Sequence, residues 1–282
     1  MRDLVIAAVA APFDRDMEAC FRRIERVLGE ARVCGAGLVV LPEAALGGYV
    51  ESLHADEDAP APPALEPDGP ELRRLASLAR DLTICVGFAE DGGDGVVHNA
   101  AACVSGDGLL GLHRKVHLPL AEDRTTTPGD ELAAFDTPVG RIGMLVCYDK
   151  AFPEAARTLA LDGAQILAFL SAWPCSQTDP AARMQEDRQW RLAELWDRAR
   201  AAENQVVVAS ANQTGSFGSL RFLGGARIVG PNGDPLAATG IHPGLALASV
   251  DVAGTVARAR RSLAPIRDRR PEVYRLTEPL VV

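Results

Sequence analysis

Short apolar segments of strand length recur along this chain, and longer segments with helical periodicity lie between several of them. We expect strands near residues 4–11, 37–42, 83–89, 97–104, 108–117, 132–136, 141–147, 165–171, 206–211, 226–230 and 246–251. We expect helices at residues 16–33, 70–80, 153–162 and 184–203. Helices of this length can cover both faces of a sheet, so the pattern predicts a layered α/β fold.

The length of the chain and its even composition predict one domain. A chain of 282 residues can bury a large core. We expect a single domain over residues 1–254 and a C-terminal extension over residues 255–282, which is rich in Arg and poor in apolar residues. The stretch 51–69 is rich in Pro and acidic residues and interrupts the α/β pattern, which predicts a surface excursion.

Cys147 lies where an apolar run gives way to a helix. The strand-like segment Gly143–Val146 precedes it, while Pro153 and Glu154 follow at positions typical of the first turn of a helix. A cysteine beside apolar residues is usually a small core residue. A cysteine at such a bend is accessible, so the setting favours a nucleophile. Asp149 either orients the backbone of the bend or meets a polar substrate.

Two further polar side chains follow strand-like segments. Glu43 ends the apolar run Gly37–Pro42, and the carboxyl ends of parallel strands form the usual ligand edge of an α/β sheet. Lys115 lies in Leu110–Leu118, where cationic and apolar residues alternate. Such alternation alone is typical of an edge strand with one wet face, so the residue pattern does not distinguish Lys115 from its cationic neighbours.

Taken together, the segments Leu41–Glu43, His113–Leu118 and Cys147–Asp149 resemble the nitrilase superfamily of carbon–nitrogen hydrolases. The resemblance extends from about Ile6 to Val252. It implies a four-layer αββα sandwich and a catalytic set of Glu43, Lys115 and Cys147.

The same resemblance implies a second glutamate between the lysine motif and a Pro-Gly-Asp segment. Glu122 lies seven residues after Lys115 and has suitable spacing to support the lysine or the substrate. Asp123 is adjacent, so the choice between these two carboxylates stays open, and a solvated loop acid is the alternative for both.

The chemistry of these residue types agrees with that family. A cysteine attacks carbon as the thiolate, and a thiol with an ordinary pKa near ~8.5 is mostly protonated at neutral pH. Glu43 can take that proton. Attack on a carbonyl places negative charge on oxygen, which the Lys115 ammonium and the backbone NH of Tyr148 can stabilise. The resulting thioester releases ammonia or an amine first, and activated water then releases the acid.

In relatives, the substrate pocket is lined by residues that come shortly after the general base and shortly after the strand that follows the nucleophile helix. These places are occupied here by Tyr49 and Trp173, and we expect both, with Tyr148, at the pocket. Simple packing is the alternative for each aromatic residue. Acidic side chains near the mouth would favour a cationic substrate, although charge runs are usually solvated faces; these side chains are Glu51, Asp56, Glu57 and Asp58.

We therefore predict a hydrolase that cleaves a small carboxamide or N-carbamoyl compound through a Cys147 thioester. The segment Cys147–Glu154 looks more like the amidase branches than the nitrilases, so nitrile hydrolysis is the alternative. Acyl transfer and a non-catalytic interaction role are less favoured. Superfamily members that transfer lipid acyl groups are embedded in membranes. A non-catalytic member would normally have lost Glu43, Lys115 or Cys147.

Composition and sequence pattern limit the classes of partner that the chain can bind. A net charge of −9 and a pI near 5.1 argue against nucleic-acid binding. No apolar stretch reaches the ~18 residues that cross a bilayer, and the chain predicts a cytoplasmic protein. The histidines and cysteines show no metal-ligand spacing suited to their segments, so we expect no metal and no cofactor. The resemblance implies a homodimer or larger homo-oligomer. Residues 255–282 either reach onto a second subunit or form a solvated tail.

Overall fold

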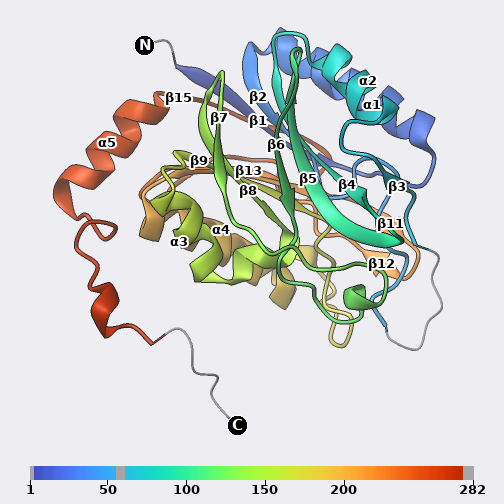
Figure 1. Cartoon of the computed structure of the whole chain (residues 1–282). Coiled ribbons are helices and arrows are strands. Elements are labelled where there is room, and N and C mark those ends of the chain that lie inside the picture. The colour runs from blue at the N-terminus through green and yellow to red at the C-terminus, as the bar shows by residue number, and fades with distance from the viewer. Residues whose placement is uncertain (1–2, 55–60, 276–282) are drawn as a thin grey trace.

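The computed structural model describes residues 3–54 and 61–275 of the chain (Figure 1). The main helices are α1 (Met17–Val33), α2 (Pro70–Ala79), α3 (Pro153–Leu161), α4 (Arg188–Asn204) and α5 (Val252–Ser262). The short 3-10 helices are η1 (Glu122–Arg124), η2 (Cys147–Ala151), η3 (Met184–Glu186) and η4 (Pro271–Val273). The strands are β1 (Leu4–Ala11), β2 (Ala36–Val40), β3 (Ala64–Leu65), β4 (Thr83–Gly93), β5 (Val96–Ser105), β6 (Gly108–Arg114), β7 (Ala134–Thr137), β8 (Gly140–Val146), β9 (Ile166–Ser171), β10 (Val207–Gln213), β11 (Ser216–Phe217), β12 (Leu220–Arg221), β13 (Arg227–Val229), β14 (Pro235–Ala238) and β15 (Gly244–Val250).

Strand alternation divides the core into layers, as β1 illustrates. Ile6, Ala8 and Ala10 contribute to a central cluster that also contains alternate residues of β8, β9 and β10. Ala7 and Val9 belong to a second cluster, which α1 and α2 cover. A third cluster lies between the sheet and the helices α3 and α4. The layers therefore run helix, sheet, sheet, helix (Figure 1), and the predicted αββα architecture is confirmed.

The strand order brings the ends of several distant segments to one edge. The main path is β6-β5-β4-β2-β1-β10-β9-β8-β7, and the strands β4, β2, β1, β10, β9 and β8 are parallel to one another. Strand β6 is antiparallel to β5, which is antiparallel to β4, so β6 ends at this edge too. Glu43, Lys115, Cys147 and Trp173 follow β2, β6, β8 and β9 respectively.

Several predicted elements end or begin at different residues, and hydrogen bonds explain two of these differences. The strand expected at 108–117 ends at Arg114, because the backbone NH groups of Val116 and His117 turn to the Asp149 carboxylate. The helix expected at 184–203 begins at Arg188, because the Asp187 side chain accepts a hydrogen bond from Gln189 N and caps the helix. Residues Met184–Glu186 form the separate 3-10 turn η3.

The two segments expected to lie outside the core contain some ordered structure. In the stretch 51–69, residues 55–60 lie outside the described part, but Ala64–Leu65 pairs with β4 and Leu65 is buried. The prediction of a surface excursion was therefore wrong for β3. Helix α5 was not predicted, although Val252 and Val256 are spaced to share one face and both join the central core cluster.

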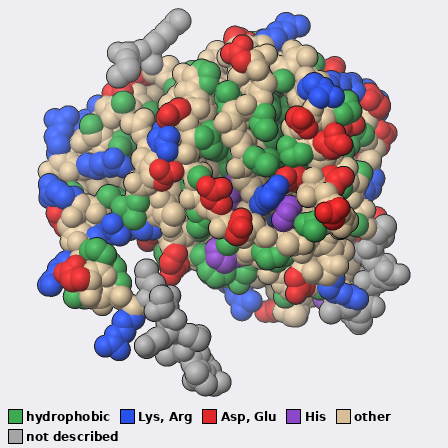
Figure 2. All heavy atoms as spheres, viewed as in Figure 1, with side chains coloured by type: hydrophobic (Ala, Val, Ile, Leu, Met, Phe, Trp, Pro, Cys, Tyr) green, Lys and Arg blue, Asp and Glu red, His purple; other side chains and the backbone are tan. Residues whose placement is uncertain are grey.

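The surface carries both signs of charge. Figure 2 shows acidic and basic side chains interspersed over the face in view, with no large area of one sign. Among residues 3–54 and 61–275, no helix combines the length and apolar character needed to cross a membrane.

Gly87 in β4 lies directly against the segment that carries Glu43. A Cβ atom at this position would lie 2.5 Å from Ala44 N and from Glu43 Cα. We expect Gly87→Ala to displace that segment and to lower the free energy of unfolding by roughly 1–3 kcal/mol, the usual cost of overpacking. Urea denaturation followed by circular dichroism measures the change.

Gly29 in α1 provides the matched control, because a Cβ atom there would meet nothing within 4 Å. Gly29→Ala should raise the free energy of unfolding by about 0.5–1 kcal/mol, since alanine favours a helix interior more than glycine does. Equal stability of the two variants would contradict the close approach at Gly87.

Candidate active site

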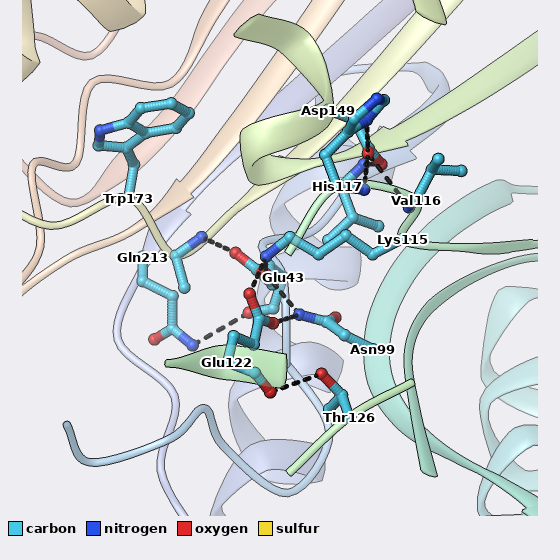
Figure 3. A network of polar contacts seen from close by, with 12 residues as sticks. Glu43, Asn99, Lys115, Val116, His117, Glu122, Thr126, Asp149, Trp173 and Gln213 are labelled. Atoms are coloured by element: carbon cyan, nitrogen blue, oxygen red, sulfur yellow. Dashed lines mark hydrogen bonds and ion pairs between the residues drawn. The ribbon is translucent and has the colours of Figure 1, made fainter. Parts of the chain in front are cut away.

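A buried ammonium lies between two buried carboxylates at the carboxyl edge of the sheet. Lys115 Nζ is 2.9 Å from Glu43 Oε1 and 2.6 Å from Glu122 Oε2. Lys115 and Glu43 are both 0% exposed. Figure 3 shows Lys115 extending toward both glutamates. A charge removed from water is costly unless it is paired, so the three side chains compensate one another.

Backbone and amide donors fix Glu43 in place. Asn99 Nδ2 donates to Glu43 Oε1 at 2.7 Å, and Ala172 N donates to Glu43 Oε2 at 2.5 Å. The Gln213 amide donates to the backbone oxygen of Glu43 and accepts from Phe13 N. The carboxylate is therefore held from β5 and from the end of β9, and the backbone of Glu43 is held from the end of β10.

The structure distinguishes between the two candidate second carboxylates. Glu122 is buried and Asp123 is exposed. The 3-10 helix η1 positions Glu122, and its backbone oxygen accepts hydrogen bonds from the backbone and hydroxyl groups of Thr126 (Figure 3). Glu122 Oε1 also accepts from Asn99 Nδ2 at 2.5 Å. Asn99 thus bridges both carboxylates that contact Lys115.

Cys147 lies at a strained bend between β8 and η2. Its φ of +50° is in the left-handed region, which non-glycine residues rarely adopt and which typically costs about 1 kcal/mol or more. The apolar strand β8 leads into the bend, and Pro153 begins α3 soon after it. Such strain is found where the surrounding structure fixes an unusual backbone for a purpose.

Asp149 fixes this bend from within. Its carboxylate accepts hydrogen bonds from Val146 N, Val116 N and His117 N at 2.9–3.1 Å. It also accepts from His113 Nε2 at 3.0 Å and from His117 Nδ1 at 2.8 Å. Of the two roles considered for Asp149, the structure shows the orientation of backbone, and the carboxylate joins the nucleophile bend to the segment that follows β6.

The surroundings set the protonation states. Burial raises the pKa of the Cys147 thiol well above its usual value, and the negative charge of Glu43 raises it further while Lys115 opposes the rise. Burial alone would lower the pKa of Lys115, but the charges of Glu122 and Glu43 raise it well above its usual value. The site therefore combines a neutral thiol with a permanent ammonium, which can donate a hydrogen bond but cannot accept a proton.

Burial also raises the pKa of Glu122, against the opposing charge of Lys115. For Asp149 the direction is opposite. Burial would raise its pKa, but the hydrogen bonds from His113 and His117 hold it well below its usual range. Asp149 is therefore a permanent carboxylate at neutral pH.

A cavity of about 430 Å³ opens beside the thiol and is large enough for a small molecule. The predicted pocket residues Tyr49, Tyr148 and Trp173 all line it together with Cys147. The Lys115 ammonium lies 5.8 Å from the centre of the Tyr49 ring. One wall is aromatic, because Trp173 packs at 5.2 Å from Trp196 of α4.

Several residues of the site were not identified from the sequence. Asn99 lies in the largely apolar strand β5, and a lone amide in such a strand is a signal that could have been read. Gln213 lies beside a second amide, Asn212, at the end of the buried strand β10. Ala172 contributes only its backbone NH, which no sequence pattern reveals.

Comparison with known proteins gives consistent results. Residues 5–260 match the family described as carbon-nitrogen hydrolase. The deaminated glutathione amidase of Homo sapiens is 33% identical, over 92% of this chain and 80% of that protein. A nitrilase of Pyrococcus abyssi is 32% identical, over 90% of this chain and 92% of that protein.

Among solved structures, a mutant of the amidase from Nesterenkonia sp. AN1 is similar, with a TM-score of 0.78 and 26% sequence identity. The match covers 96% of this chain and 95% of that one. That structure contains the acetamide moiety of fluoroacetamide joined covalently to the active-site cysteine.

Replacing Asp149 tests whether its carboxylate joins the nucleophile bend to the segment that follows β6. Asp149→Asn removes the charge and places an amide group against backbone NH donors, so we expect the free energy of unfolding to fall by about 3 kcal/mol or more. Urea denaturation measures this loss. Asp136→Asn is the control, because Asp136 is exposed in its ion pair with Arg141 and exposed pairs contribute little. Similar losses in both variants would contradict the structural role of Asp149.

Proposed function

Because the chain belongs to the carbon–nitrogen hydrolase family, we propose that it hydrolyses a small carboxamide or N-carbamoyl compound through a thioester on Cys147. The observation that carries this proposal is the position of Cys147. Its thiol lines a cavity of substrate size, and the charges of Glu43 and Lys115 both act on it.

Glu43 is the general base of the proposed reaction. Lys115 cannot accept the thiol proton, because its raised pKa keeps it an ammonium. Of the two carboxylates, Glu43 acts more strongly on the pKa of Cys147 than Glu122 does. The neutral thiol therefore gives its proton to Glu43 as the sulfur attacks, and no free thiolate accumulates beforehand.

Lys115 and the backbone NH of Tyr148 stabilise the oxyanion. Tyr148 is the second residue of η2, and the first NH groups of a helix have no intrahelical acceptor. The ammonium is fixed by Glu43 and Glu122. Donors that are already oriented need no reorganisation when charge develops on the substrate oxygen.

The two half-reactions balance with one base. In the first, the C–S bond forms, the C–N bond breaks, and the proton held by Glu43 goes to the departing nitrogen. In the second half-reaction, a water molecule gives a proton to Glu43, and the oxygen of that water attacks the thioester carbonyl. The C–S bond breaks, the acid leaves, and the thiol regains its proton.

Nitrile hydrolysis is the second candidate, because the Pyrococcus abyssi relative is called a nitrilase. The same thiol attacks a nitrile carbon, and the site offers the ammonium of Lys115 near the developing charge. The relatives called amidases support the first candidate.

The test is ammonia release from small amides, N-carbamoyl compounds and nitriles. We expect activity on an amide or carbamoyl compound and a loss of at least roughly a thousandfold in Cys147→Ala, as for other removed nucleophiles. Cys34→Ala, at an exposed cysteine, is the control for the substitution.

Cys175 also lines the cavity, so it must be tested as the competing nucleophile. Activity that is lost in Cys175→Ala and kept in Cys147→Ala would overturn the assignment. Activity on nitriles alone would favour the second candidate.

We also propose that the chain forms a homo-oligomer through its C-terminal extension. Beyond Ile266, which still packs on the third core cluster, the chain runs along the outside of the molecule (Figure 1), and Val273 and Tyr274 are exposed there. Deletion of residues 268–282 keeps α5 and its core contacts, and we expect light scattering to show a lower mass than for the full chain. An unchanged mass would contradict the proposal.

A further inference from the structure

The cavity beside Cys147 has an asymmetric charge. Among the described residues that line it, Arg188 is the one with a permanently charged side chain, and none is Asp or Glu. The remaining lining is apolar, aromatic or neutral polar, as with Leu192, Trp196 and Gln189. Apart from the buried cluster of Glu43, Lys115 and Glu122, the cavity lining therefore offers a substrate one cation and no fixed anion.

Arg188 has no carboxylate partner within the described part of the chain. The positions that could pair with it along α4 and the preceding turn are Met184, Gln185, Arg191 and Leu192, and none is acidic. No hydrogen bond or ion pair of its side chain occurs among the described residues. Arg183 nearby does have such a partner, because it pairs with Glu186.

The carboxylate of Asp187, which precedes Arg188 in the sequence, already has hydrogen-bond partners. Asp187 is 1% exposed, and its oxygens accept hydrogen bonds from Ser176 N, Gln189 N and Ala181 N. These contacts fix the loop that precedes α4. Asp187 does not line the cavity, so it does not compete with a ligand for the Arg188 guanidinium.

Two other cations near the nucleophile already have carboxylate partners: Lys115 pairs with Glu43 and Glu122, and Lys150 pairs with Asp197. Lys150 Nζ pairs with Asp197 at 2.9 Å, and Arg227 pairs with the second oxygen of Asp197 at 2.9 Å. Both cations are buried. Arg188 is therefore the cation of the cavity lining that has no carboxylate partner among the described residues.

A guanidinium is suited to one ligand chemistry above others. Its planar set of donors matches a carboxylate and binds it through two parallel hydrogen bonds. The aromatic side chains of Trp173 and Trp196 line the same cavity and suit a short apolar spacer. Trp173 Nε1 donates to Gln189 Oε1 at 3.1 Å, which fixes the residue beside Arg188.

We infer that the substrate is a small amide that carries a carboxylate at its far end, with Arg188 binding the carboxylate while Cys147 attacks the amide carbon. This inference rests on the proposed function for the identity of the reacting group. It opposes the expectation of a cationic substrate. Asp56, Glu57 and Asp58 lie outside the described residues, and Glu51 does not line the cavity.

The test compares matched substrates on the full chain. Succinamic acid carries the carboxylate, butyramide is its neutral counterpart of the same length, and N-carbamoylglycine presents the carbamoyl alternative. We expect kcat/KM for the better of the two acids to exceed that for butyramide by about tenfold or more, a factor typical of one charge-assisted contact. Arg188→Gln should remove most of this ratio, mainly through KM, and Arg188→Lys should restore part of it.

Arg191→Gln is the matched control, because Arg191 lies on the same helix but does not line this cavity. Its ratio should equal that of the native chain. The inference is overturned if Arg188→Gln keeps the native ratio, or if the native chain prefers butyramide.

A binding measurement separates this inference from the proposed reaction. Calorimetry of Cys147→Ala with succinamic acid and N-carbamoylglycine, with and without Arg188→Gln, reports on the carboxylate contact without any turnover. Binding of either acid that weakens about tenfold in the double variant supports the contact, even if no amide is hydrolysed by the native chain. Equal binding, or none, overturns it.

Discussion

The burial of the Lys115 ammonium constrains the rest of this structure. A cation removed from water needs nearby anions, and each anion then needs donors of its own. Glu43 and Glu122 meet the first need, while Asn99 and the backbone NH of Ala172 meet the second. These groups come from β5, η1 and the ends of β2, β6 and β9. The sheet order is what brings those segments to one place, so the fold and the charge cluster depend on each other.

A second buried carboxylate supports the strained nucleophile. The left-handed backbone at Cys147 is unfavourable by itself. The hydrogen bonds that Asp149 accepts from Val146 N and His117 N hold the two sides of the bend in register with the segment after β6. Because Lys115 begins that segment, one carboxylate relates the position of the thiol to that of the ammonium.

The sequence predicted the parts of the molecule that depend on local pattern. Short apolar segments of strand length placed most strands, and the family resemblance implied the αββα layers. The motifs around Glu43, Lys115 and Cys147 placed three polar side chains that the structure brings to one sheet edge. The sequence did not predict several residues whose hydrogen-bond partners are distant along the chain. Asn99 and Gln213 gain their roles only through strand pairing, and the carboxylate that stops β6 lies 33 residues from Val116. The charge of the cavity depends on a loop whose course no local pattern specifies.

Arg188 lies at the start of α4, so the proposed substrate contact and the reacting groups belong to different parts of the chain. The reacting groups lie at strand ends that the core fixes, whereas Arg188 follows a loop fixed chiefly by Asp187. A change in the length or capping of that loop would move the first turn of α4 while the strand ends keep their places. Descendants of such a chain could therefore acquire new substrates by remodelling one surface segment, with the bond-breaking apparatus inherited unchanged.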